Sequence, residues 1–278
     1  MNDEIVNDIT RRNFLDSLAC LVGGSAAALA LLPVLEGDDS QAPIVAEDDK
    51  NLAISRVEYD ASGTKIAGYL ARVKGGRKRP GVIVIHENRG LNAHIQDVAR
   101  RIAIEGFLAL APDMLSPLGG TPSDENQATK MIGSLKTEET VARLAAAVRF
   151  LASHAESTRK VGVVGFCWGG GMVNELAAAG TSLNAGVAYY GRQLPAAQVP
   201  KISAPLLLHY AGLDERINAG IPDYEAALKA NNKVYEKYMY EGANHAFNNN
   251  TNPARYNKEA ADLAWSRTIK FLKQYLGT

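Results

Sequence analysis

The chain has 278 residues, of which 46% are hydrophobic and 22% are charged, so its composition is that of a globular protein with room for one large core. Its 30 basic and 30 acidic side chains cancel, and its tyrosines are not interleaved with basic runs, which argues against a nucleic-acid binder. The two cysteines, Cys20 and Cys167, are too few to define a disulfide framework.

Residues 1–46 resemble an export signal followed by a linker. Thr10-Arg11-Arg12-Asn13-Phe14-Leu15 resembles a twin-arginine signal, and an apolar stretch of small residues follows from Leu18 to Leu35. Because this stretch is only marginally hydrophobic, no stable membrane span is expected. The sequence predicts that the precursor meets the twin-arginine export machinery and that residues 47–278 form a periplasmic or secreted domain. A signal that does not function would leave the protein in the cytoplasm.

Short apolar runs alternate with stretches of helical periodicity through the rest of the chain. A hairpin of two strands, Ser55–Asp60 and Lys65–Val73, is predicted first. Further strands are predicted at Gly81–Ile85, Phe107–Pro112, Val161–Phe166, Ala185–Tyr190, Pro205–Tyr210 and Val234–Tyr240, and helices at Ile95–Gly106, Glu138–His154, Met172–Ala179, Pro222–Asn231 and Asn252–Tyr275. Ser116–Asn126 is rich in glycine and proline and is predicted to be a loop beside a pocket. This alternation predicts an α/β fold with a mostly parallel central sheet and helices on both faces.

The segment Gly165-Phe166-Cys167-Trp168-Gly169 joins a predicted strand to a predicted helix. Its glycines permit a sharp turn, and the pattern G-x-C-x-G matches the nucleophile elbow of α/β-hydrolases, which is usually written with serine. A cysteine that merely follows a buried strand is more often a small core residue. Within this pattern, we expect Cys167 to be a catalytic nucleophile.

Asp214 and His245 each follow a predicted strand in the C-terminal third of the chain. In α/β-hydrolases the triad runs in the order nucleophile, acid and histidine, and parallel sheets of this kind carry their sites at the carboxyl ends of the strands. We therefore expect Cys167, Asp214 and His245 to form a catalytic triad, with Glu215 as a competing acid.

A metal site is not expected. His86 and Glu87 begin like the zinc-binding motif H-E-x-x-H, but position 90 is Gly90 and the pair follows a strand rather than lying within a helix. The triad chemistry itself needs no cofactor.

Several motifs together resemble the dienelactone hydrolase family over roughly residues 55–275. Beside the cysteine elbow, they are His86-Glu87-Asn88-Arg89-Gly90, Ala111-Pro112-Asp113, Tyr189-Tyr190-Gly191, Gly212-Leu213-Asp214 and Asn244-His245-Ala246-Phe247. The resemblance implies the α/β-hydrolase fold, with Cys167 as nucleophile, His245 as base and later acid, and Asp214 as its orienting partner. It also implies that Glu87 modulates the thiol. The backbone N–H groups of Asn88 and Trp168 would form the oxyanion hole.

The arginines with which this family binds carboxylated lactones are missing from their usual places. The corresponding segments, Asp113-Met114-Leu115-Ser116-Pro117 and Phe247-Asn248-Asn249-Asn250, contain none. Arg89, Arg192 and Arg216 are candidates to replace them. The resemblance implies cysteine-dependent hydrolysis of a small ester or lactone through an acyl-enzyme. Two alternatives stay open: an esterase on larger acylated molecules such as acetylated sugars, and a non-catalytic binding protein on the same scaffold.

Overall fold

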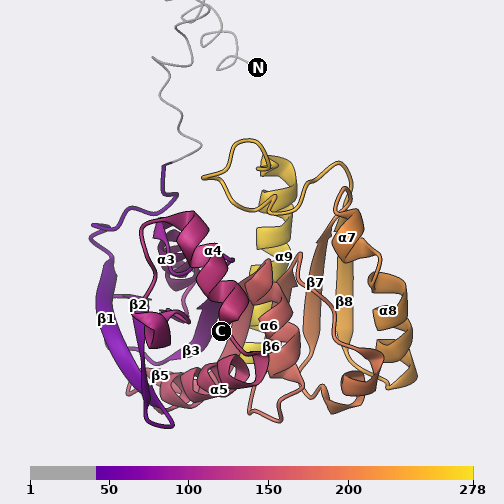
Figure 1. The fold of residues 1–278 in the computed structure, drawn as a ribbon. Coiled ribbons are helices and arrows are strands. Elements are labelled where there is room, and N and C mark those ends of the chain that lie inside the picture. Colours follow the sequence, from indigo (N-terminus) through magenta and orange to yellow (C-terminus); the bar gives the residue numbers. More distant parts are fainter. Residues whose placement is uncertain (1–41, 278) are drawn as a thin grey trace, which may run out of the picture. The chain divides into compact units, whose positions relative to one another are not determined.

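The computed structural model describes residues 42–277, so the twin-arginine pair and the apolar stretch predicted as a signal lie outside the described residues. Eight strands form one sheet in the order β1-β2-β4-β3-β5-β6-β7-β8 (Figure 1). Their bounds are β1 Leu52–Ala61, β2 Thr64–Val73, β3 Arg79–Ile85, β4 Leu108–Pro112, β5 Ser157–Phe166, β6 Ala185–Tyr189, β7 Leu206–Ala211 and β8 Tyr235–Tyr240. β2 is antiparallel to both β1 and β4, and all strands from β4 to β8 in this order are parallel.

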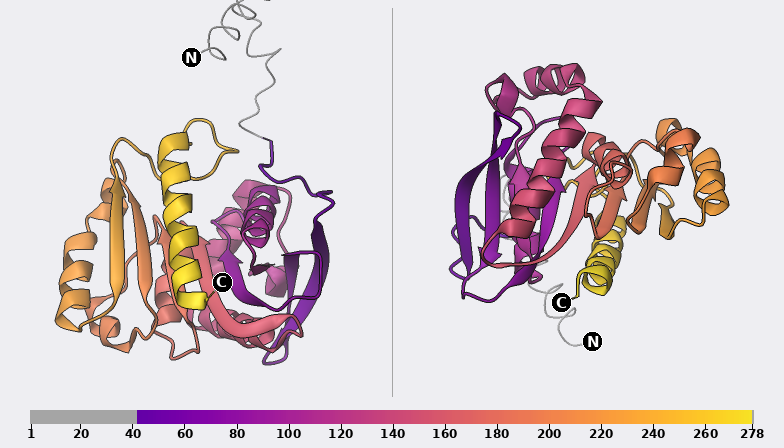
Figure 2. Two further views of the ribbon diagram at one scale, coloured as in Figure 1. Left: turned by 180° about the vertical axis from the view of Figure 1, so that it is seen from behind. Right: turned by 90° about the horizontal axis from the view of Figure 1, so that it is seen from below.

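Helices cover both faces of the sheet (Figure 2). α3 (Ala93–Ile104) and α9 (Lys258–Leu276) pack on one face, and α5 (Thr137–Ser153), α6 (Trp168–Ala177) and α8 (Ile221–Ala230) pack on the other. Alternate residues of the buried strand β3 contribute to the two apolar layers, because side chains along a strand point to opposite faces. The structure thereby confirms the expected mostly parallel sheet with helices on both faces.

The structure adds helical segments that the sequence patterns do not predict. They are the short 3₁₀ turns η2 (Ser116–Leu118) and η3 (Ala196–Lys201), the helix α4 (Glu125–Ser134) and the single turn α7 (Glu215–Asn218). The prediction of a continuous loop over 116–126 is therefore wrong at both of its ends. α4 begins where the Asp124 side chain accepts hydrogen bonds from the backbone N–H groups of Asn126 and Gln127.

The last helix begins later than predicted. α9 starts at Lys258 rather than at Asn252, because Asn257 caps it by accepting a hydrogen bond from the N–H of Ala260. Pro253 also disfavours helical geometry at the residue before it. The segment between β8 and α9 is therefore a long non-helical connection, and it borders the site described below.

The carboxyl ends of the parallel strands meet at one edge of the sheet. β3, β5, β7 and β8 all end there, and each is followed within a few residues by one of Glu87, Cys167, Asp214 and His245. None of the helices within residues 42–277 is long and apolar enough to cross a bilayer.

Candidate active site

Cys167 lies on a sharp turn between β5 and α6. Its backbone has φ 54° and ψ −114°, a conformation that costs free energy for a residue with a side chain. The flanking glycines are required by close packing, because a Cβ atom on Gly165 would lie 2.2 Å from the Gly169 carbonyl oxygen. A Cβ atom on Gly169 would lie 2.5 Å from the carbonyl oxygen of His86. The predicted elbow geometry is thus present, and it presents the half-buried thiol at the edge of the sheet.

His245 and Asp214 are in direct contact. The Nδ1 atom of His245 forms a short hydrogen bond with Oδ2 of Asp214, so Nδ1 carries the proton and Nε2 is left to accept one. Asp214 is 7% exposed, and its other carboxylate oxygen accepts from the N–H of Ile217 at the start of α7. The competing acid Glu215 lies within α7 and is exposed, and it is not the histidine's partner.

Cys167 and His245 border the same cavity of about 290 Å³. Glu87 and Asn88 border it as well, so the structure brings together residues that follow three different strands. One side of the wall comes from α4, whose residues Glu125 and Asn126 belong to the segment 116–126 that the sequence placed at a pocket. Asn249 and Arg255, which border the cavity from the connection between β8 and α9, were not predicted as site residues.

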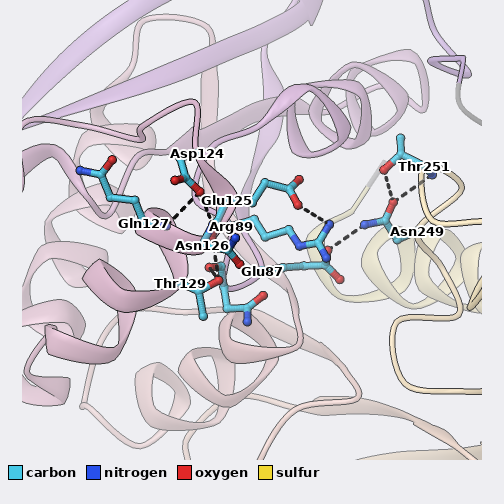
Figure 3. Close-up of polar contacts among 10 residues, drawn as sticks. Glu87, Arg89, Asp124, Glu125, Asn126, Gln127, Thr129, Asn249 and Thr251 are labelled. Carbon is cyan, nitrogen blue, oxygen red and sulfur yellow. Dashed lines mark hydrogen bonds and ion pairs between the residues drawn. The ribbon is translucent and has the colours of Figure 1, made fainter.

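Glu87 is buried and held by neutral donors. The Nδ2 atom of Asn249 donates to one carboxylate oxygen at 2.9 Å (Figure 3). The hydroxyl of Tyr190 donates to the other at 3.5 Å. Thr251 fixes the Asn249 amide, because its N–H and its hydroxyl both donate to Oδ1 and leave Nδ2 facing Glu87. Burial raises the pKa of Glu87, and the hydrogen bond from Asn249 opposes that rise.

The thiol of Cys167 is a weak acid in this setting. Burial, and next the negative charge of Glu87, raise its pKa to about 11, although the N–H of Trp168 and the charge of Arg216 act in the opposite direction. Burial lowers the pKa of His245, while Asp214 opposes this shift. At neutral pH the cavity therefore holds a protonated thiol and a neutral imidazole.

Two residues carry the backbone N–H groups predicted to form the oxyanion hole. Trp168 is the first residue of α6, and its backbone N–H lowers the pKa of the Cys167 thiol. Asn88 follows β3 and borders the same cavity. The Thr129 hydroxyl of α4 donates to the Asn88 carbonyl oxygen at 3.2 Å, which ties α4 to this segment.

Three arginines border the cavity, and they differ in their partners. Arg89 forms an ion pair of 2.9 Å with Glu125 of α4. Arg216 and Arg255 are exposed and form no ion pair within residues 42–277. Arg192 does not border the cavity; its side chain is 73% exposed and lies 3.9 Å from Glu175. Of the three arginines suggested by the sequence, only Arg216 is both at the site and unpaired, and Arg255 was not among the candidates.

The sequence model of the dienelactone hydrolase family matches residues 66–276. A protein of Saccharolobus solfataricus that is provisionally named a carboxymethylenebutenolidase is 34% identical over 254 residues, which cover 78% of this chain and 96% of that protein. The protein named usf of Aquifex pyrophilus is 33% identical, and the match covers 79% of this chain and 98% of that protein.

Solved structures agree with the sequence comparison. The crystal structure of a provisionally assigned dienelactone hydrolase from Klebsiella pneumoniae superposes with a TM-score of 0.75 at 28% identity, covering 81% of this chain and 99% of that one. A dienelactone hydrolase-like promiscuous phosphotriesterase from metagenomic libraries gives a TM-score of 0.73 at 25% identity, covering 82% and 100%. This likeness confirms the expected α/β-hydrolase fold.

Proposed function

This chain belongs to the dienelactone hydrolase family and is a hydrolase of carboxylic esters, and we propose that it cleaves small esters or lactones through an acyl-enzyme on Cys167. The observation that carries the proposal is that His245, which is hydrogen-bonded to Asp214, borders the same cavity as the thiol of the elbow. A relative named for a lactone-opening activity supports lactones within the substrate class.

The first step is activation of the thiol. His245 accepts the proton of Cys167 at Nε2, and Asp214 stabilises the resulting imidazolium through Nδ1. Because the pKa of the thiol is about 11, little thiolate exists before substrate binds. The resting cysteine is therefore poorly reactive, and activation depends on the arrangement of substrate, His245 and Glu87.

Attack on the substrate carbonyl follows. The thiolate forms a C–S bond, the carbonyl oxygen takes up the negative charge, and the N–H groups of Asn88 and Trp168 donate to it. Collapse of this intermediate breaks the ester C–O bond, and His245 gives its proton to the departing oxygen. In a lactone the departing oxygen stays attached to the acyl group, so the ring opens on the enzyme.

Water completes the cycle. His245 accepts a proton from a water molecule, the resulting hydroxide attacks the thioester carbonyl, and the C–S bond breaks to release a carboxylic acid and the thiolate. The imidazolium then returns its proton to Cys167. Each atom is accounted for by the substrate, one water molecule and the three side chains, so the scheme draws on no cofactor.

The charge of the cavity favours an acidic substrate. Arg216 and Arg255 border it without an acidic partner among residues 42–277, whereas Arg89 is already paired with Glu125. Unpaired guanidinium groups bind carboxylates through charge-assisted hydrogen bonds. We assign the role of the missing family arginines to Arg216 and Arg255. The cavity of about 290 Å³, closed on one side by α4, favours small substrates over large acylated sugars.

The test is turnover of a panel of aryl esters and lactones by the full chain. Cys167→Ala should abolish turnover, because Cys167 is the cysteine that borders the cavity. Cys20→Ala, which removes the only other cysteine, should leave the rate unchanged. Denaturing mass spectrometry of the wild type during turnover should show the acyl adduct on the peptide that contains Cys167. Full activity of Cys167→Ala would refute the nucleophile, and absence of turnover by the wild type would favour the non-catalytic alternative.

Export through the twin-arginine route is a separate proposal, which places the mature domain in the periplasm or outside the cell. Its support is the Arg11-Arg12 pair ahead of an apolar stretch. Replacing both arginines with lysine should retain the protein in the cytoplasm on cell fractionation. Arg77→Lys, in an exposed turn of the folded domain, serves as the control. Unchanged export of the double variant would overturn the route.

A further inference from the structure

His86 is a fully buried histidine beside the site that the mechanism above does not use. It follows the last residue of β3 and directly precedes Glu87. Its Nδ1 atom lies 2.7 Å from the carbonyl oxygen of Glu87, and its Nε2 atom lies 3.3 Å from the backbone nitrogen of Met114. A buried ring with both nitrogens in hydrogen bonds to the main chain is held in one orientation.

These two contacts also determine the tautomer. The N–H of Met114 can only donate, so Nε2 of His86 accepts and the ring proton sits on Nδ1. Nδ1–H then donates to the carbonyl oxygen of Glu87. Burial lowers the pKa of His86, which agrees with a neutral ring.

The hydrogen bond acts on the peptide unit that supplies an oxyanion donor. The carbonyl of Glu87 and the N–H of Asn88 belong to one planar, trans peptide group, so they point in opposite directions. Fixing the carbonyl oxygen therefore fixes the direction of the Asn88 N–H. A hydrogen bond to the oxygen also polarises the group and makes its N–H a stronger donor.

His86 also contacts the side chain of Trp168, the residue that carries the second donor. Its ring stacks on the indole of Trp168, with ring centroids 5.2 Å apart and an interplanar angle of 16°. The main chain at His86 is also in close contact with the main chain at Gly169. A Cβ atom on Gly169 would lie only 2.5 Å from the His86 carbonyl oxygen. One side chain thus links the Asn88 segment after β3 to the start of α6.

We propose that His86 is a positioning residue that holds the N–H groups of Asn88 and Trp168 in register for the developing oxyanion. This inference rests on the proposed acyl-transfer function. In this role His86 transfers no proton and does not contact the substrate. Its contribution is to the transition state, in which the carbonyl oxygen carries the charge that the two N–H groups stabilise.

Three substitutions separate the contacts of His86. His86→Phe keeps a ring to stack on Trp168 but removes both hydrogen bonds. His86→Asn places an amide N–H near the position of Nδ1 and so retains a donor for the Glu87 carbonyl oxygen. His86→Gln places its amide near the position of Nε2 instead, where the amide oxygen can accept from the N–H of Met114. The three variants differ chiefly in which hydrogen bond survives, and thermal unfolding identifies any that fail to fold.

The expected result is a fall in kcat of about 10- to 100-fold for His86→Phe, with KM little changed. The kcat of His86→Gln should fall similarly. The kcat of His86→Asn should be about tenfold higher than that of His86→Phe, because one hydrogen bond contributes about this factor. Alkylation of Cys167 by iodoacetamide forms no oxyanion, so its rate should stay within about twofold of the wild type in all three.

Two results would overturn the proposal. One is a wild-type kcat for His86→Phe and His86→Gln. The other is a loss of kcat that the alkylation rate follows in parallel, which would indicate a general disturbance of the elbow. Failure of the proposed function is recognised separately, because it would show as an inactive wild type or an active Cys167→Ala variant.

Discussion

The inner and outer parts of the cavity are built in different ways. The inner part, made by Glu87, Cys167 and His245, consists of buried or half-buried groups that follow the ends of strands. Glu87 is held by Asn249 and Tyr190, and His245 by its hydrogen bond with Asp214 behind it. The outer part carries the exposed arginines Arg216 and Arg255 on the turn α7 and on the connection before α9. The same cavity therefore joins a buried, hydrogen-bonded interior to an exposed, charged rim.

This difference separates reaction type from substrate choice. In the interior, burial and hydrogen bonds set the protonation state of each group, so a change there alters the chemistry. At the rim, charges are screened by solvent and act mainly by attracting and orienting a ligand. We expect substitutions in the interior to change kcat and substitutions at the rim to change KM. Matched substitutions in the interior and at the rim test that division.

Adjacent acids at the end of β7 provide the strongest test. Asp214 is buried against His245, and Glu215 is its exposed neighbour. Asp214→Asn should lower kcat by about 10⁴-fold, because an amide no longer holds the imidazole in the required tautomer or stabilises its charge. Asparagine is also a good helix cap, so α7 should persist. Steady-state kinetics with an aryl ester provide the measurement.

The matched control is Glu215→Gln, which should leave kcat within about twofold because an exposed surface substitution away from the site has little effect. Equal losses in both variants would contradict the assignment of Asp214 and would also remove the distinction between buried and exposed acids at this strand end.

The rim should govern discrimination between acidic and neutral substrates. Replacing Arg216 and Arg255 together with alanine should raise KM for a carboxylate-bearing ester by about 10- to 100-fold, the loss of one or two charge-assisted hydrogen bonds. KM for the uncharged analogue should change little. Because Arg216 also affects the pKa of Cys167 and of His245, the ratio of kcat/KM for the two substrates is the quantity to compare.

Arg192→Ala is the control, since this exposed arginine faces Glu175 outside the cavity. If the double variant discriminated between the two substrates as well as the wild type does, the rim arginines would not bind the substrate carboxylate.

The interior of the site could be predicted from the sequence because short-range patterns encode it. Each of Glu87, Cys167, Asp214 and His245 lies within a few residues of an apolar run, and parallel strands bring such ends to one edge. The elbow is encoded even more locally, because close packing demands glycine at Gly165 and Gly169. The alternation of strands and helices predicted the sheet for the same reason.

The rim could not be predicted in this way, because it depends on long-range placement. α4 buries only Ala128 and Ile132, so its apolar periodicity is weak, and Asp124 followed by Gln127 was its one local signal. Arg192 lies away from the site because the Asn174 side chain binds its carbonyl oxygen and its guanidinium faces Glu175. The contact between Asn249 and Glu87 joins residues 162 positions apart, which no local pattern reveals.

The smallest predicted effect concerns the control of the thiol by the buried carboxylate. Glu87 raises the pKa of Cys167, so Glu87→Gln should lower that pKa. A lower pKa increases the thiolate fraction at any pH below it, so alkylation by iodoacetamide should be about threefold to tenfold faster at pH 8. The curve of alkylation rate against pH should move to lower pH.

Glu125→Gln is the matched control, because Glu125 borders the same cavity but is exposed and paired with Arg89. Its charge is screened by solvent and by the arginine, so the alkylation curve should not move. Glutamine at position 87 still offers an oxygen to the fixed Nδ2 of Asn249, so the site should keep its geometry while it loses the charge. Identical curves for Glu87→Gln and the wild type would show that the thiol is governed by burial alone. Equal shifts in both variants would instead assign the effect to the total charge of the cavity, and the division between its interior and its rim would fail.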